Sequence, residues 1–173
     1  MNDDQFVALF HALDRLPGPD HLEFPDGFDH DAAEERATAL LTRLGEDIGP
    51  CLLGGAQDAA SYFSVAVPAE ATEAGVLLCV RLSNFGGLAV VTTPGPADHD
   101  DLAHAVRDGA LSEADRGRVE AALSDLGCTL VPQRLLHRRY DGVTRLTDDG
   151  DTFLGYGVHA GRATWWTRFF EHL

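Results

Sequence analysis

The residues best suited by type to do chemistry lie between positions 98 and 108. Acids and histidines crowd this stretch, as Asp98-His99-Asp100-Asp101 followed by His104 and Asp108. On a helix, Asp100, His104 and Asp108 share one face, and two carboxylates with an imidazole can ligate a divalent metal ion. His99 and His104 would point about 140° apart on that helix, which differs from the histidine pair of zinc hydrolases. We expect a solvated polar face without a bound metal or cofactor. The alternative is a small metal-dependent enzyme or metal-binding protein that uses this cluster.

Other motifs lack parts that their chemistry needs. Only 12 residues follow the GxGxxxG of residues 155–161, whereas a dinucleotide-binding loop opens a helix and precedes an acid by about 20 residues. The DDGD of residues 148–151 lacks the alternating acids and terminal Glu of a calcium loop. A histidine could activate Cys51 as a nucleophile, but no spacing favours this pairing. The sequence therefore identifies no catalytic residue, and we expect a protein that is not an enzyme.

The charge of the chain argues against several kinds of partner. Its 173 residues include 13 Arg, no Lys and 28 acids, which gives a formal net charge of −15. Nucleic-acid contacts need clustered basic residues, and an acidic field is repelled by anionic lipids. We therefore expect neither nucleic-acid nor membrane binding. The chain starts with acids rather than a secretory signal, and its three cysteines are an odd number with no paired spacing, so we expect a cytoplasmic protein. The lack of Lys indicates a GC-rich bacterial genome.

The negative charge is concentrated in the first third of the chain. Residues 1–60 carry a net charge of −10, and the remaining residues carry −5. The more negative part includes a segment of alternating acids and aromatic residues, Asp20, Glu23, Phe24, Asp26, Phe28, Asp29 and Asp31. Opposed electrostatic fields accelerate association, and buried aromatic side chains slow dissociation. The segment predicts a docking surface for a basic protein. The alternative is a solvated loop in an acidic proteome.

Two later stretches are each open to two interpretations. Arg134, Arg138, Arg139 and Arg145 concentrate positive charge, which could neutralise acids of the chain or bind an anion. The sequence TWWTRFF of residues 164–170 is either an element that docks into the core or an exposed anchor for a partner.

Hydrophobic periodicity predicts a single α+β domain over residues 1–173. A helix capped by Asn2 is followed by a helix over 31–44 that ends at Gly45, and by a Gly-rich connector over 50–58. Strands over 63–67, 76–82 and 88–93 form a meander. Helices over 98–108 and 113–126 precede a short strand over 128–131. We expect a mostly antiparallel sheet, a three-stranded meander plus one or two short strands, with helices packed on one face.

In size, charge and single-domain α+β character, and in its aromatic ending at residues 164–170, the chain resembles the small acidic immunity proteins of bacterial toxin systems. The resemblance implies a non-enzymatic protein that neutralises a basic toxin. Another inhibitor, or a chaperone-like partner of a basic protein, fits the same composition. No functional residue is carried over from any family.

Overall fold

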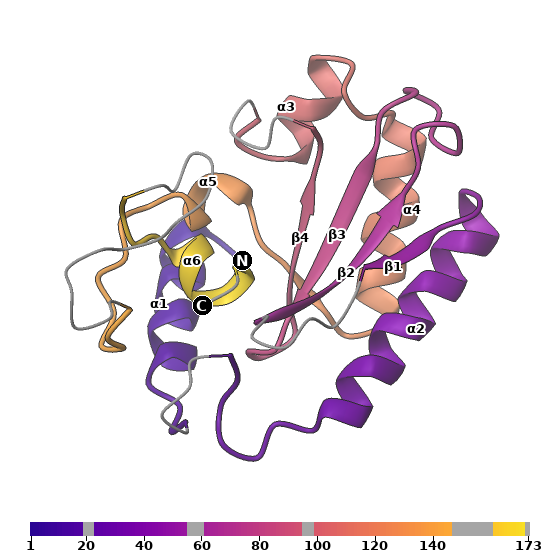
Figure 1. The fold of residues 1–173 in the computed structure, drawn as a ribbon. Helices are drawn as coiled ribbons and strands as arrows, with labels where there is room; N and C mark the ends of the chain where they lie inside the picture. The colour runs from indigo at the N-terminus through magenta and orange to yellow at the C-terminus, as the bar shows by residue number, and fades with distance from the viewer. Residues whose placement is uncertain (19–22, 55–60, 95–98, 147–160, 172–173) are drawn as a thin grey trace.

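The computed structural model describes residues 1–18, 23–54, 61–94, 99–146 and 161–171. Their centre is a five-stranded sheet with the strand order β1-β2-β3-β4-β5 (Figure 1). The strands are β1 (Leu52–Gly54), β2 (Tyr62–Val67), β3 (Leu78–Ser83), β4 (Leu88–Thr92) and β5 (Thr129–Leu130). Neighbouring strands from β1 to β4 are antiparallel, and β5 is parallel to β4. The predicted α+β class and the mostly antiparallel sheet are confirmed.

The meander forms because its strands alternate as a half-buried sheet requires. Phe63, Val65 and Val67 of β2 are buried on one face, and the residues between them are half-buried. A tight turn at Gly86 and Gly87, both with positive φ, joins β3 to β4. A Cβ on Gly86 would lie 2.5 Å from a terminal carbon of the Leu13 side chain, so any larger residue here would force that side chain of the N-terminal helix to shift.

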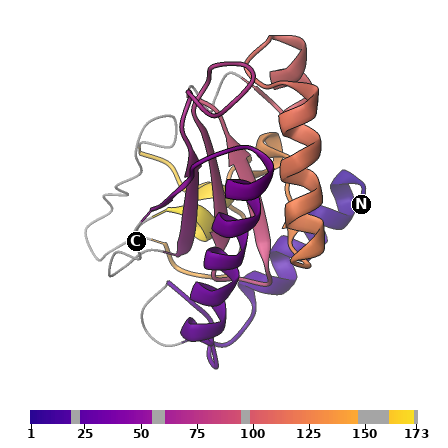
Figure 2. The ribbon, with the colours of Figure 1, turned by 90° about the vertical axis from the view of Figure 1, so that its right-hand side faces the viewer.

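Two long helices cover one face of the sheet and lie side by side in Figure 2: α2 (His30–Asp47) and α4 (Glu113–Asp125). Leu40 and Leu44 of α2 and Leu123 of α4 are buried against the strands. The predicted end of the second helix at Gly45 is wrong. The helix continues to Asp47 because Ile48 still packs on the core, and its C-cap amide bonds to the Leu44 carbonyl.

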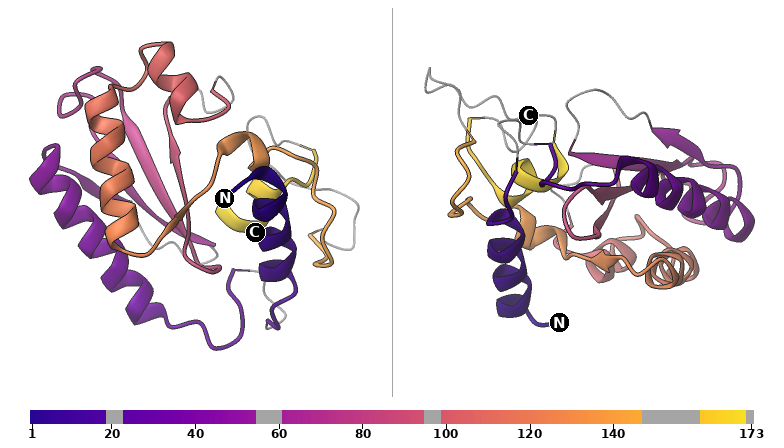
Figure 3. Two further views of the ribbon diagram at one scale, coloured as in Figure 1. Left: turned by 180° about the vertical axis from the view of Figure 1, so that it is seen from behind. Right: turned by 90° about the horizontal axis from the view of Figure 1, so that it is seen from below.

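A second, aromatic layer packs on the opposite face, so the expectation that the helices pack on one face only is corrected. It is formed by α1 (Asp3–Asp14), α5 (Gln133–Leu136) and α6 (Trp165–Phe170), which lie together in Figure 3. Phe10 of α1 contacts Trp165 and Phe169 of α6, with ring centroids 5.5 and 5.8 Å apart. Trp165 is 1% exposed and Phe170 is fully buried. The aromatic tail is therefore part of the core, and its alternative interpretation as an exposed anchor is wrong.

Three further elements differ from the sequence expectation. Strand β1 lies within the stretch interpreted as a connector, and α5 was not predicted. The helix expected over 98–108 is the shorter α3 (Leu102–Arg107), which begins where the Asp101 side chain caps the His104 amide. Strand β1 has only three residues, which is too short for an alternating apolar pattern to show in the sequence.

Candidate functional site

A cluster of exposed acids lies at the start of α2 and in the loop before it. We call this cluster the acidic surface; it consists of Asp26, Asp29, Asp31, Glu34 and Glu35. None of the five forms an ion pair with another residue of the part of the chain that the structure describes. Asp29 also caps α2, because its Oδ1 accepts from the Ala32 amide at 3.0 Å. Asp20, the first acid of the predicted segment, lies outside the described residues.

Contacts with the rest of the fold fix the loop that carries these acids. The rings of Phe24 and Phe28 stack with centroids 5.3 Å apart, and Phe28 packs against the core. The Asn84 side-chain amide donates to the Glu23 carbonyl at 3.0 Å. Glu23, Phe24 and Phe28 are only half-exposed. The two rings therefore anchor the loop, and the docking role expected for them stays a prediction.

Glu34 and Glu35 were not among the predicted docking residues. They follow Asp31 by three and four positions, so the helical spacing of α2 places all three side chains on one exposed face. That spacing was the available signal. The same face is open to solvent and also carries Thr38 and Thr42.

Many acids elsewhere are neutralised by arginines. Arg134 donates to both carboxylate oxygens of Asp3, at 2.6 and 2.7 Å, and this bond holds the pKa of Asp3 below its usual value. Arg118 donates to Asp115 at 2.7 Å and to Glu73 at 3.0 Å. Of the two interpretations of the Arg134–Arg145 stretch, Arg134 supports neutralisation within the chain.

A buried ion pair joins α1 to the C-terminal helix. The Nε of Arg168 donates to Asp14 Oδ1 at 2.7 Å, and both side chains are 5% exposed or less. Asp14 Oδ2 also accepts from the Tyr140 hydroxyl at 2.7 Å and from the Val143 amide at 2.6 Å. Burial would raise the pKa of Asp14, but Arg168 and these other donors together lower it. This pair is structural, because it lies among the packed elements.

The histidines of the 98–108 cluster come together, unlike the sequence expectation. His99 precedes α3, so helical geometry does not separate it from His104, and their ring centroids are 5.4 Å apart. Their Nε2 atoms lie 3.6 and 3.3 Å from Asp108 Oδ2. Within the described ranges no group of three or more His, Cys, Asp or Glu is arranged to hold a metal ion. Asp98 is outside those ranges.

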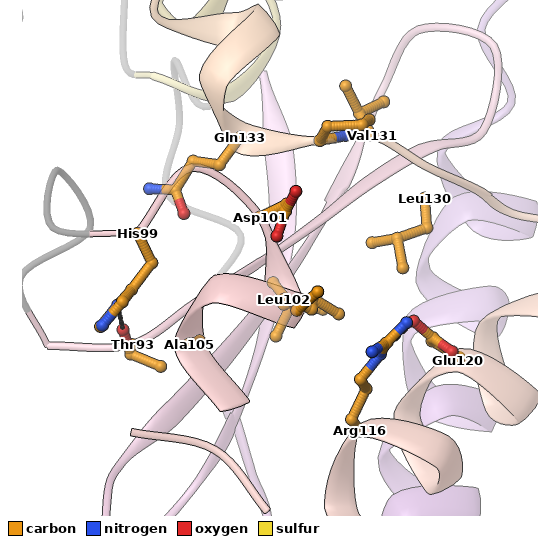
Figure 4. Close-up of a pocket in the computed structure, with 13 residues that line it drawn as sticks. Thr93, His99, Asp101, Leu102, Ala105, Arg116, Glu120, Leu130, Val131 and Gln133 are labelled. Atoms are coloured by element: carbon orange, nitrogen blue, oxygen red, sulfur yellow. Dashed lines mark hydrogen bonds and ion pairs between the residues drawn. The ribbon is translucent and has the colours of Figure 1, made fainter. Parts of the chain in front are cut away.

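A pocket of about 230 Å³ lies beside this cluster, between α3, α4, β4 and the chain that follows β5. Its apolar walls include Val91, Leu102, Ala105, Leu130, Val131 and Pro132. Figure 4 shows its polar residues at the two ends, with Arg116 and Glu120 at one and His99, Thr93 and Gln133 at the other. Asp101 lies between the ends.

Cys51, considered in the sequence as a possible nucleophile, has a thiol that is hydrogen-bonded to the backbone. The Sγ of Cys51 donates to the Gly49 carbonyl at 3.1 Å, and burial raises the pKa of this thiol. A raised pKa disfavours the nucleophilic thiolate. The DDGD of residues 148–151 and most of the GxGxxxG of residues 155–161 lie outside the described residues.

No family model, curated protein or solved structure matches this chain. Among the described helices, none is both long and apolar enough to cross a membrane.

Proposed function

We propose that this chain is a non-enzymatic binding protein that presents the acidic surface to a basic protein. The most concrete version is an immunity or inhibitor protein that neutralises a basic bacterial toxin. A chaperone-like partner of a basic protein is the broader version.

The observation that carries the proposal is where the unneutralised charge lies. The carboxylates of Asp3, Asp14 and Asp115 each have an arginine within 3 Å. The five acids of the acidic surface have no such partner in the described chain, and all are exposed. Asp29 and Asp31 already stabilise the start of α2 through its cap and its dipole. Glu34 and Glu35 add like charge beside Asp31, and because neighbouring like charges destabilise a helix, an approaching cation would relieve this repulsion.

The shape of the acidic surface supports the same function. The anchored aromatic pair Phe24–Phe28 holds the loop against the core, so little conformational entropy is lost when a partner docks. The open face of α2 lets a basic side chain approach Asp31, Glu34 and Glu35 together. A charge-assisted hydrogen bond to one of these carboxylates is stronger than one between neutral groups.

The test is capture from a host lysate with two charge variants. The first replaces Asp26, Asp31 and Glu35 with Lys and leaves the capping residue Asp29 unchanged. The control replaces three exposed acids elsewhere, Asp4, Glu46 and Glu70, with Lys. Each variant changes the net charge by the same amount, and each reverses one acid in the first turn of a helix.

We expect the wild type and the control to retain the same basic protein at low salt, and the first variant to lose it. Co-expression should then show whether the chain suppresses the toxicity of the captured protein. Equal retention by all three proteins, or equal loss from both variants, would contradict the assignment of the acidic surface.

A further inference from the structure

The pocket beside β4 arises because the sheet ends early on this side. The amides of Thr129 and Val131 donate to the carbonyls of Gly87 and Ala89, at 2.9 and 2.8 Å. The next residue is Pro132, which has no amide hydrogen, and α5 begins directly after it. By the two-residue period of the strand, the peptide groups of Val91 face the same edge, and Val91 lines the pocket. The pocket therefore combines a polar strand edge with apolar side chains.

The charge around the pocket is negative. Its one lining guanidinium, Arg116, donates to Glu120 at 2.9 Å and lies 3.7 Å from Glu113. Asp101 acts on Arg116 as a third carboxylate, and the three together raise the pKa of Arg116. Arg134 also lies within electrostatic reach of Asp101, but it donates to Asp3. At the other end, His99 lies 3.6 Å from the carboxylate of Asp108.

Asp101 is the group best placed to meet a ligand. One of its oxygens, Oδ1, accepts from the His104 amide at 2.8 Å and caps α3. Within the described chain, Oδ2 has no hydrogen-bond donor. Figure 4 shows this carboxylate between the two polar ends of the pocket.

We propose that this pocket binds a small organic cation, a primary amine attached to an apolar body the size of one aromatic ring. The apolar walls bury the body, and the ammonium group bonds to Asp101. The volume of about 230 Å³ fits this size, since it equals the liquid volume of about eight water molecules at about 30 Å³ each. This inference is independent of the function proposed for the acidic surface.

The experiment compares three probes of similar size by NMR titration: benzylamine, benzyl alcohol and benzoate. We expect saturable shifts from benzylamine at the pocket residues, binding of benzyl alcohol at least about tenfold weaker, and no binding of benzoate. Equal affinity for benzylamine and benzyl alcohol would overturn the cation preference. No saturable binding of benzylamine at about 10 mM would overturn the site itself.

Three variants assign the interaction to Asp101 and to the pocket. Asp101→Asn keeps a capping side chain, and we expect it to weaken benzylamine binding about tenfold without changing the affinity for benzyl alcohol. Asp100→Asn is the control, because it makes the same charge change one residue away at an exposed position that does not line the pocket. Ala103→Leu fills the pocket and should abolish binding of both probes. Equal weakening by Asp100→Asn and Asp101→Asn, or unchanged binding in Ala103→Leu, would contradict the proposal.

Discussion

Replacing Asp14 with Asn should destabilise the protein strongly, because it removes the buried carboxylate to which Arg168 Nε donates at 2.7 Å. Arg168 is 4% exposed and Asp14 is 3% exposed. The guanidinium also lies over the ring of Phe85, with its Cζ 4.1 Å from the ring centroid, so water has little access to it. An Asn at position 14 keeps the shape of the side chain but removes the charge and places an amide group where donors now converge.

The expected loss of unfolding free energy is about 3–5 kcal/mol, the range for removing one partner of a buried pair. For a domain of this length, each kcal/mol lowers Tm by about 2–4 °C, so the expected decrease is about 6–20 °C. Thermal unfolding followed by circular dichroism measures it. The control is Asp141→Asn, which removes an exposed carboxylate 3.4 Å from His11 and should change stability by no more than about 0.5 kcal/mol.

The pH dependence gives the prediction a second readout. The folded pKa of Asp14 is lowered, so its stabilising contribution is complete above the unfolded value of about 3.9 and is lost as the pH falls through the folded value. The difference in stability between the wild type and Asp14→Asn should stay constant from about pH 7 to pH 5 and narrow below about pH 4. A Tm of Asp14→Asn within 2 °C of the wild type's, or a difference that widens in acid, would refute this reasoning.

Two further predictions concern Tyr140 and Gly86. Burial and the Asp14 carboxylate raise the pKa of Tyr140, so the contribution of Tyr140 to stability is complete below its unfolded pKa of about 10 and declines as the pH rises further. In urea titrations above about pH 10, the wild type should therefore lose more stability than Tyr140→Phe. Parallel losses in the two proteins would contradict this assignment. Gly86→Ala combines a positive φ with a contact to Leu13 and should cost about 2–3 kcal/mol, whereas Gly109→Ala, with positive φ and open space, should cost only about 1 kcal/mol. Equal losses in the two glycine variants would show that the approach of α1 does not depend on Gly86.

Local periodicity predicted much of the fold. Strands β2, β3 and β4 lie within two residues of their predicted bounds, and Asn2 caps α1 as expected. The alternation of apolar and polar residues predicts these strands, and capping side chains predict where the helices begin. The second layer was not predictable in this way. Phe10 and Trp165 are in contact although most of the chain lies between them in sequence, and a local sequence pattern cannot predict such a long-range contact.

The candidate sites were predictable only in part. The acids of the acidic surface could be found from composition, but their lack of arginine partners depends on where Arg118 and Arg134 fold back onto other acids. The meeting of His99 and His104 depends on the start of α3, and helix boundaries are the least certain feature of a sequence prediction. The pocket depends on the short parallel pairing of β5 with β4, and no sequence motif predicts this pairing.

The most direct test of the central claim is the association rate of the chain with its captured basic partner, measured by stopped flow at several salt concentrations. Steering by the acidic surface predicts a wild-type rate that falls about tenfold or more as salt rises to about 0.15 M. The variant with Lys at positions 26, 31 and 35 should associate slowly at every salt concentration, and the control with Lys at positions 4, 46 and 70 should stay close to the wild type. A wild-type rate that is independent of salt, or two variants with the same rate, would contradict the claim.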